Sequence, residues 1–113
     1  YHALSDVHQH DALDDCLKAI ENPRIFAITK FASRRYDTAD FAPGDALLFG
    51  AETTGLPESI HNAIDDDQKL ALPMTGGNRS LNLANAVSVV LYEAWRTCDF
   101  AGMVMLPANP DLV

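Results

Sequence analysis

Two polar, glycine-containing segments follow apolar runs in this 113-residue chain. The first is FGAETTGLP, residues 49–57, in which Gly50 has no Cβ and Glu52 supplies a carboxylate. A backbone without a Cβ lets a ligand approach closely, and ligands of open α/β sheets bind beyond the carboxyl ends of strands. The segment therefore predicts a binding site, and the alternative is an ordinary turn between a strand and a helix.

The second segment is LPMTGGNRSLNLAN, residues 72–85. Ser80, Asn82 and Asn85 crowd a predicted helix start, where a single side chain would suffice as the cap. Arg79 could bind a phosphate or a carboxylate, or it could be a solvated surface arginine. Neither segment contains a glycine fingerprint for nucleotide phosphates, so we expect a ligand that is not held by its phosphates.

A group of histidine and aspartate side chains near the start has the donor chemistry of a metal site: His2, His8, His10, Asp6 and Asp11. On a helix, however, His8 and His10 would point to different faces. We therefore expect no metal site. The G-x-S-x-G pattern of a nucleophilic serine is also absent.

The elements that position these segments follow from the pattern of apolar residues. Strands are predicted over 24–29, 46–50 and 69–73, and helices over 6–21, 57–64 and 81–97. The remaining stretches are predicted as connections, and the part from Ala101 to Val113 as a loose tail. Alternating strands and helices indicate one α/β domain over 1–113, with a mainly parallel sheet.

The helix over 83–95, LANAVSVVLYEAW, is apolar on nearly every face. A surface helix would show a polar stripe. The helix must therefore be enclosed in the core or buried against a second copy of the chain. The first helix has one apolar face, and Cys16 on that face is expected to be a buried, inert thiol.

The composition limits the remaining possibilities. Sixteen acidic residues against eight Lys and Arg give a net charge of −8, which argues against a broad basic surface for nucleic acid. Arg34, Arg35 and Arg79 are the cations that could contact a nucleic acid locally, although the first two could equally be solvated. No apolar run approaches the length of a membrane span, so we expect no membrane partner.

Two stretches carry a family resemblance. LLFGAETTGLPESI resembles the second motif, and LALPMTGGNRSLNLANAVSVVLYEAWR the third motif, of the SpoU-type (SPOUT superfamily) RNA 2′-O-methyltransferases. The match is nearest to the small TrmL (YibK-like) group and extends from Tyr1 to about Trp95. The resemblance implies an α/β fold with a C-terminal trefoil knot, a homodimer through helix 83–95, and a cytoplasmic enzyme. It also implies S-adenosylmethionine as cofactor, tRNA as partner, and methylation of the ribose at wobble position 34, a cytidine or uridine.

The resemblance also assigns roles to individual positions. The cofactor would be held at the three strand-end loops by Ile28, Gly50, Glu52, Leu72, Met74, Ser80, Leu81 and Asn85. Arg79 would contact tRNA phosphate, and Tyr92 would contact the cofactor or the partner subunit.

One part of the family pattern is not matched. The first motif of these enzymes contains an Asn and an Arg that assists the reaction at the ribose, and nothing here resembles it. We therefore expect several dozen residues, including a first strand, to precede Tyr1 in the complete enzyme, and no catalytic residue is assigned. Two alternatives remain: a non-catalytic cofactor- or RNA-binding module, and a ribosomal RNA 2′-O-methyltransferase of the same family.

Overall fold

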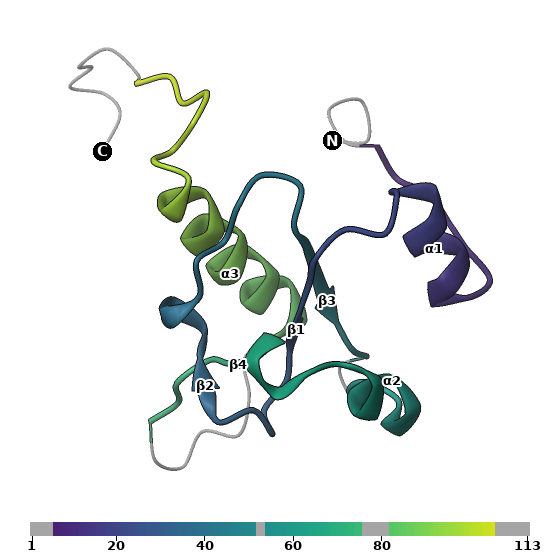
Figure 1. Cartoon of the computed structure of the whole chain (residues 1–113). Helices are drawn as coiled ribbons and strands as arrows, with labels where there is room; N and C mark the ends of the chain where they lie inside the picture. Colours follow the sequence, from purple (N-terminus) through teal and green to yellow (C-terminus); the bar gives the residue numbers. More distant parts are fainter. Residues whose placement is uncertain (1–5, 52–53, 76–81, 106–113) are drawn as a thin grey trace.

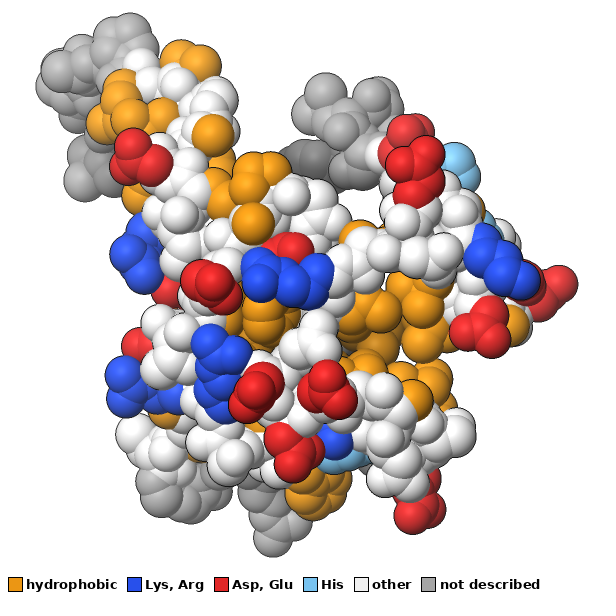
Figure 2. Space-filling view, viewed as in Figure 1, with side chains coloured by type: hydrophobic (Ala, Val, Ile, Leu, Met, Phe, Trp, Pro, Cys, Tyr) orange, Lys and Arg blue, Asp and Glu red, His pale blue; other side chains and the backbone are white. Residues whose placement is uncertain are grey.

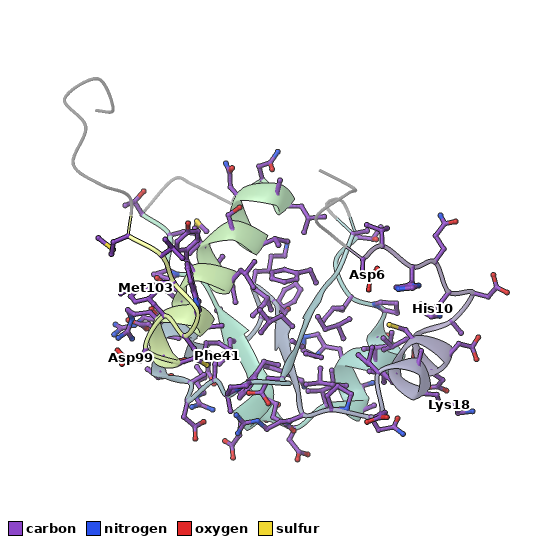
Figure 3. All side chains as sticks on the ribbon, turned by 90° about the horizontal axis from the view of Figure 1, so that it is seen from above. Asp6, His10, Lys18, Phe41, Asp99 and Met103 are labelled. Atoms are coloured by element: carbon purple, nitrogen blue, oxygen red, sulfur yellow. The ribbon has the colours of Figure 1, made fainter. Side chains whose placement is uncertain are left out.

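A four-stranded parallel sheet forms the centre of the computed structural model, which describes residues 6–51, 54–75 and 82–105. The strand order is β2-β4-β1-β3. Helix α3 lies on one side of the sheet, and helices α1 and α2 lie on the other (Figures 1 and 3). The strands are β1 (Ile25–Ile28), β2 (Arg34–Arg35), β3 (Ala46–Phe49) and β4 (Lys69–Ala71). The helices are α1 (Leu13–Ala19), α2 (Glu58–Ala63) and α3 (Leu83–Thr97), with short 3₁₀ turns over Tyr36–Thr38 and Asp66–Gln68. The expected mainly parallel α/β sheet is confirmed.

The hydrophobic core lies between the sheet and α3. Phe26 from β1, Leu70 from β4 and Val90 from α3 are buried together with Ala39 and Phe41 from the connection between β2 and β3. The rings of Phe26 and Phe41 meet edge to face, with centroids 5.0 Å apart. β1 and β4 are the inner strands, and the apolar sequence of β1 fits burial on both faces.

Five of the predicted elements are present with shifted bounds. The predicted strands 24–29, 46–50 and 69–73 correspond to β1, β3 and β4, and the last of these ends two residues early. The predicted helices 57–64 and 81–97 correspond to α2 and α3.

The prediction of a helix over 6–21 was wrong in length. α1 begins at Leu13, after Ala12 in an extended conformation with no side-chain cap. It ends where Glu21 and Asn22 adopt positive φ angles of 65° and 51°. No residue of α1 is buried, and Cys16 is half-buried rather than buried as expected.

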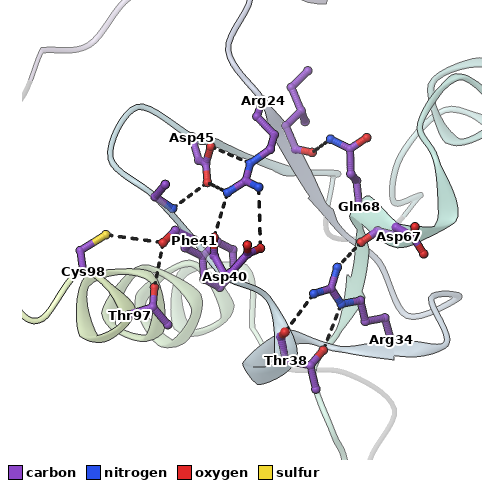
Figure 4. Close-up of polar contacts among 12 residues, drawn as sticks. Arg24, Arg34, Thr38, Asp40, Phe41, Asp45, Asp67, Gln68, Thr97 and Cys98 are labelled. Atoms are coloured by element: carbon purple, nitrogen blue, oxygen red, sulfur yellow. Dashed lines mark hydrogen bonds and ion pairs between the residues drawn. The ribbon is translucent and has the colours of Figure 1, made fainter.

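Strand β2 was not predicted from the sequence and lies inside the predicted polar connection. Its two residues pair with Leu70 and Ala71 of β4. Arg34 holds this edge in place, because its guanidinium donates hydrogen bonds to the Asp67 carbonyl and to Thr38 (Figure 4). Arg35 forms an ion pair with Asp37. Arg34 is thus held by the protein itself rather than being a freely solvated arginine, whereas the Arg35 side chain is 61% exposed, in line with the solvated position that the sequence suggested.

One face of α3 remains uncovered in the single chain. Val90 is its buried residue, and Ala94 packs against the core, whereas Leu91 is 57% exposed and Tyr92 64% exposed. An enclosed position within this chain is therefore contradicted. Within the described ranges, no helix combines the length and the apolar character that crossing a membrane would require.

Candidate functional site

Three of the predicted site residues come together where the parallel strands end. Ile28, the last residue of β1, pairs with Phe49 of β3 on one side and with Leu70 of β4 on the other. Gly50 follows Phe49 directly, and Leu72 lies two residues after Leu70. The register therefore brings Ile28, Gly50 and Leu72 to one edge of the sheet, from three adjacent strands.

The structure explains the glycine at position 50 by packing within the protein, and not by the approach of a ligand that the sequence suggested. A Cβ at this position would lie 2.2 Å from the carbonyl carbon of Gly55 and 2.4 Å from the amide nitrogen of Leu56. The Gly55 amide also donates a hydrogen bond to the Ala51 carbonyl at 2.8 Å, and Gly55 has a φ of +67°. The space beside Gly50 is thus filled by its own loop, and a ligand would meet that folded loop rather than the Gly50 Cα.

A polar contact links the end of β1 to α2. The Thr29 amide donates to the Leu70 carbonyl at 2.9 Å, which continues the pairing with β4. The Thr29 hydroxyl lies 3.4 Å from Nε2 of His61 on α2 and accepts a hydrogen bond from the Phe31 amide at 3.3 Å. Neither Thr29 nor His61 could be predicted as a site residue, because the contact joins residues 32 positions apart in the sequence.

The segment after β4 has neither helix nor strand from Leu72 to Thr75. Leu72 packs against the core with part of its surface exposed, and Met74 is 37% exposed. These apolar side chains therefore lie beside a stretch of backbone that has left the sheet. Such a surface fits a flat, largely apolar ring that also needs hydrogen bonds from the main chain.

Asn82 is the cap among the polar residues at the start of α3. Its Oδ1 accepts hydrogen bonds from the backbone amides of Ala84 at 2.8 Å and Asn85 at 3.4 Å. The exposed Asn85 side chain is therefore not needed as a cap. Tyr92, seven residues further along, shares a helical face with Asn85 and lies roughly 10 Å along the axis. Its ring stacks edge-on against Trp95 at 5.8 Å.

Four predicted site residues lie outside the described residues: Glu52, Arg79, Ser80 and Leu81. Among the residues that are described, no group of three His, Cys, Asp or Glu side chains could hold a metal ion. Figure 3 shows His10 and Lys18 beside α1, on the opposite side of the molecule from Asp99 and Met103 at the end of α3.

The shifted pKa values in the described part of the chain belong to ion pairs. The hydrogen bonds from Arg24 lower the pKa of Asp45, and Arg96 lowers the pKa of Glu93 in the same way. Arg24 and Asp45 precede β1 and β3, so this pair joins the amino ends of the strands, opposite the candidate site (Figure 4).

Comparison with known proteins identifies the family. The model of the SpoU rRNA Methylase family matches residues 1–92. The chain belongs to the SpoU methylase family. A tRNA (cytidine(34)-2′-O)-methyltransferase of Methylovorus glucosotrophus is 44% identical over 104 residues, which are 92% of this chain and 68% of that protein. The protein of the same name from Escherichia coli K12 is 44% identical over 106 residues, covering 93% and 67%.

Solved structures of SpoU methylases show the same fold. One, described as giving insight into the 2-OH methylation of C/U34 on tRNA, has a TM-score of 0.72 and 40% identity, with 80% of this chain and 59% of that chain covered. Another, the SpoU methyltransferase AviRb of Streptomyces viridochromogenes in complex with AdoMet, has a TM-score of 0.67 and 26% identity, covering 80% and 38%. The chain thus spans about two thirds of the curated relatives and less of these structures. The predicted resemblance is confirmed at the level of the family.

Proposed function

We propose that this chain is a tRNA methyltransferase that transfers a methyl group to the ribose 2′-oxygen of nucleotide 34, a cytidine or uridine. The observation that carries the proposal is the 44% identity, over 92% of the chain, to a protein named for this reaction. The site residues Ile28, Gly50 and Leu72 lie inside the matched region and at one edge of the sheet.

The cofactor of the proposed reaction is S-adenosylmethionine, and the apolar side chains and backbone groups of the site suit its binding. Ile28, Leu72 and Met74 offer apolar surface for the adenine ring, and the irregular backbone from Leu72 to Met74 offers hydrogen-bonding groups. The turn packed on Gly50 forms the neighbouring wall. Glu52, Ser80, Leu81 and Asn85 complete the proposed set. When bound, the cofactor supplies a methyl group on a positively charged sulfur.

The task of the chain is to fix the geometry of the transfer. The ribose oxygen must be aligned with the methyl group, and its proton must be removed. Loops that project from three paired strands suit the first requirement, because the sheet holds their bases rigidly. We assign no residue of this chain to the second. Arg79 is proposed as a contact to tRNA phosphate, and the tRNA substrate implies action in the cytoplasm.

The finer architecture is proposed on the same basis. The chain between β4 and α3 would thread through a loop to form the trefoil knot of the SPOUT superfamily. α3 would then bury the face that carries Leu91 and Tyr92 against a second copy of the chain. The support is the exposure of that face: a run of apolar side chains this long is costly to leave in water.

Two assays on the full chain test the proposal. Titration calorimetry with S-adenosylmethionine should show saturable binding. Transfer of labelled methyl groups should occur to unmodified tRNA and not to ribosomal RNA fragments. Transfer to ribosomal RNA alone would replace the tRNA assignment with the ribosomal one. Binding of cofactor and tRNA without any transfer would support the non-catalytic module.

A further inference from the structure

Phe31 is a large apolar side chain that lies exposed beside the candidate site. It follows β1 by three residues, at the same sheet edge as Ile28, and 74% of its surface is exposed. A hydrogen-bonded turn fixes its backbone: the Phe31 amide donates to the Thr29 hydroxyl at 3.3 Å, and the Ala32 amide donates to the Thr29 carbonyl at 3.3 Å. The ring is therefore presented to solvent by a short, anchored turn.

Two neighbouring side chains orient the ring without covering it. The Lys30 Nζ lies over it, 5.2 Å from the centroid. The His61 ring of α2 meets it at a centroid distance of 6.2 Å and an angle of 61°. A flat ring held by these contacts and still largely exposed has the form of a stacking platform, on which a nucleobase can lie.

Lys30 differs from most of the positively charged residues in the described part of the chain, because it forms no ion pair there. Of the eight Lys and Arg residues, Arg79 lies outside that part. Five of the other seven are engaged with carboxylates or backbone carbonyls: Arg24, Arg34, Arg35, Lys69 and Arg96. The remaining two, Lys18 on α1 and Lys30, form no ion pair with a described residue. Figure 2 shows this mixing of charges on one face, where Lys and Arg side chains lie beside Asp and Glu.

Among the described residues, Lys30 is therefore the cation without an ion pair at the edge where the site residues gather. Its charge is available to a phosphate group, and its ammonium nitrogen lies over the Phe31 ring, 5.2 Å from the centroid. Together, Lys30 and Phe31 present one positive charge and one stacking surface within two consecutive residues. A nucleotide carries the complementary pair, a phosphate and a flat base.

We infer that Lys30 and Phe31 bind the RNA strand next to the methylated ribose, with a base stacked on Phe31 and a phosphate near Lys30. The inference rests on the proposed function, since only that function requires RNA to reach the edge of the sheet beside Lys30 and Phe31. It adds a substrate contact that the family resemblance did not assign. A protein surface is the less favoured occupant, because the extended apolar face of the molecule lies on α3 and not at this turn.

The test measures binding of an unmodified tRNA transcript with cytidine at position 34 to the full chain. Phe31→Ala should weaken binding about tenfold, as expected for the loss of one stacked base, and Phe31→Trp should retain it. Lys30→Gln should weaken binding and reduce its dependence on salt concentration. The affinity for S-adenosylmethionine and the melting temperature should change little in all three variants.

Two variants at the carboxyl end of α1 serve as matched controls. Ile20→Ala removes an apolar side chain that is 48% exposed, and Lys18→Gln removes the other lysine that forms no ion pair with a described residue. Both variants should bind tRNA like the parent. Unchanged tRNA binding by Phe31→Ala would overturn the inference, as would a change in the oligomeric state in place of a change in RNA affinity. A different result would contradict the proposed function: the parent chain binds tRNA but transfers no methyl group to it. The control for that result is a known methyltransferase that is active in the same reaction mixture.

Discussion

Gly50 and Gly55 are packed backbone against backbone, so closely that a Cβ on Gly50 would lie 2.2 Å from the carbonyl carbon of Gly55. The contact folds the loop after β3 onto the end of its own strand. It thereby sets the position of the turn from Thr54 to Leu56 relative to Ile28 and Leu72. The proposed cofactor site is thus shaped by a steric requirement inside the protein.

Gly50→Ala should displace this turn. The cost of the added methyl group is about 1–3 kcal/mol of stability, as for overpacking in a core, and the affinity for S-adenosylmethionine should fall about tenfold or more. Gly44→Ala is the matched control. Its φ of +90° makes alanine unfavourable, by about 1–2 kcal/mol, but a Cβ there meets nothing within 4 Å. Titration calorimetry measures the cofactor affinity of both variants. An equal loss of affinity in the two would contradict a specific role for the contact between Gly50 and Gly55.

The exposed face of α3 should mediate association of two chains. Leu91→Asp places a charge at a position that is 57% exposed and so should leave the fold of the single chain intact. It should convert a dimer into a monomer in light-scattering measurements, with the helical circular dichroism signal preserved. Val7→Asp alters a similarly exposed side chain, 65% exposed and outside α3, and should remain dimeric. A parent chain that is monomeric at high concentration would rule out the dimer.

Hydrophobic side chains continue past the end of α3. The Trp95 ring packs on Phe100 at 5.2 Å, and its indole nitrogen donates to the Ala101 carbonyl at 2.9 Å. Met103 and Val104 follow with 52% and 85% exposure. Figure 2 shows hydrophobic side chains on the surface of the segment that follows α3. This segment therefore extends the apolar face that we propose to be buried in a dimer.

The cap of α3 should contribute measurably to stability. Asn82→Ala removes the acceptor for the amides of Ala84 and Asn85 and should lower the free energy of unfolding by about 1 kcal/mol. Asn82→Ser should restore most of the loss. Because Asn82 is expected to act on the helix and not on the ligand, chemical denaturation is the appropriate measurement. A loss as large in the serine variant would argue against capping.

Acid should weaken the link between Arg24 and Asp45. The hydrogen bonds from Arg24 lower the pKa of Asp45 in the folded state. The resulting stabilisation is present above the unfolded value of about 4 and is lost as the pH falls through the lower folded value. Asp45→Asn should therefore melt at a lower temperature than the parent at pH 7, and the gap should narrow below about pH 4. Asp40→Asn, at an 89% exposed carboxylate, should change the melting temperature little.

Much of the fold could be predicted from the sequence because burial leaves a clear pattern there. The apolar runs IFAI and ALLF became β1 and β3, and the S-L-N-L-A-N run marked the start of α3 at Leu83. Strand β2 left no such pattern, because its two arginines lie at the edge of the sheet and pair only with β4. Its position depends on hydrogen bonds from Arg34 to residues as far away as Asp67.

The location of the candidate site could be predicted from the sequence, but the contacts that shape it could not. The family resemblance assigned Ile28, Gly50 and Leu72 to strand ends, and the pairing of the parallel strands brings these ends to a common edge. The contact of Gly50 with Gly55, and that of Thr29 with His61, depend on how the loops fold in three dimensions. Phe31 looked like part of a polar connection, and its exposure beside the site emerges only from the structure.

The most direct test of the central claim is to locate the methyl group on the product. The full chain is incubated with S-adenosylmethionine and an unmodified tRNA, and the nuclease fragments are analysed by mass spectrometry. We predict one added methyl group on the ribose of nucleotide 34, and none when that nucleotide already carries a 2′-O-methyl group. A methyl group on a base, or on the ribose of a different nucleotide, would contradict the assignment.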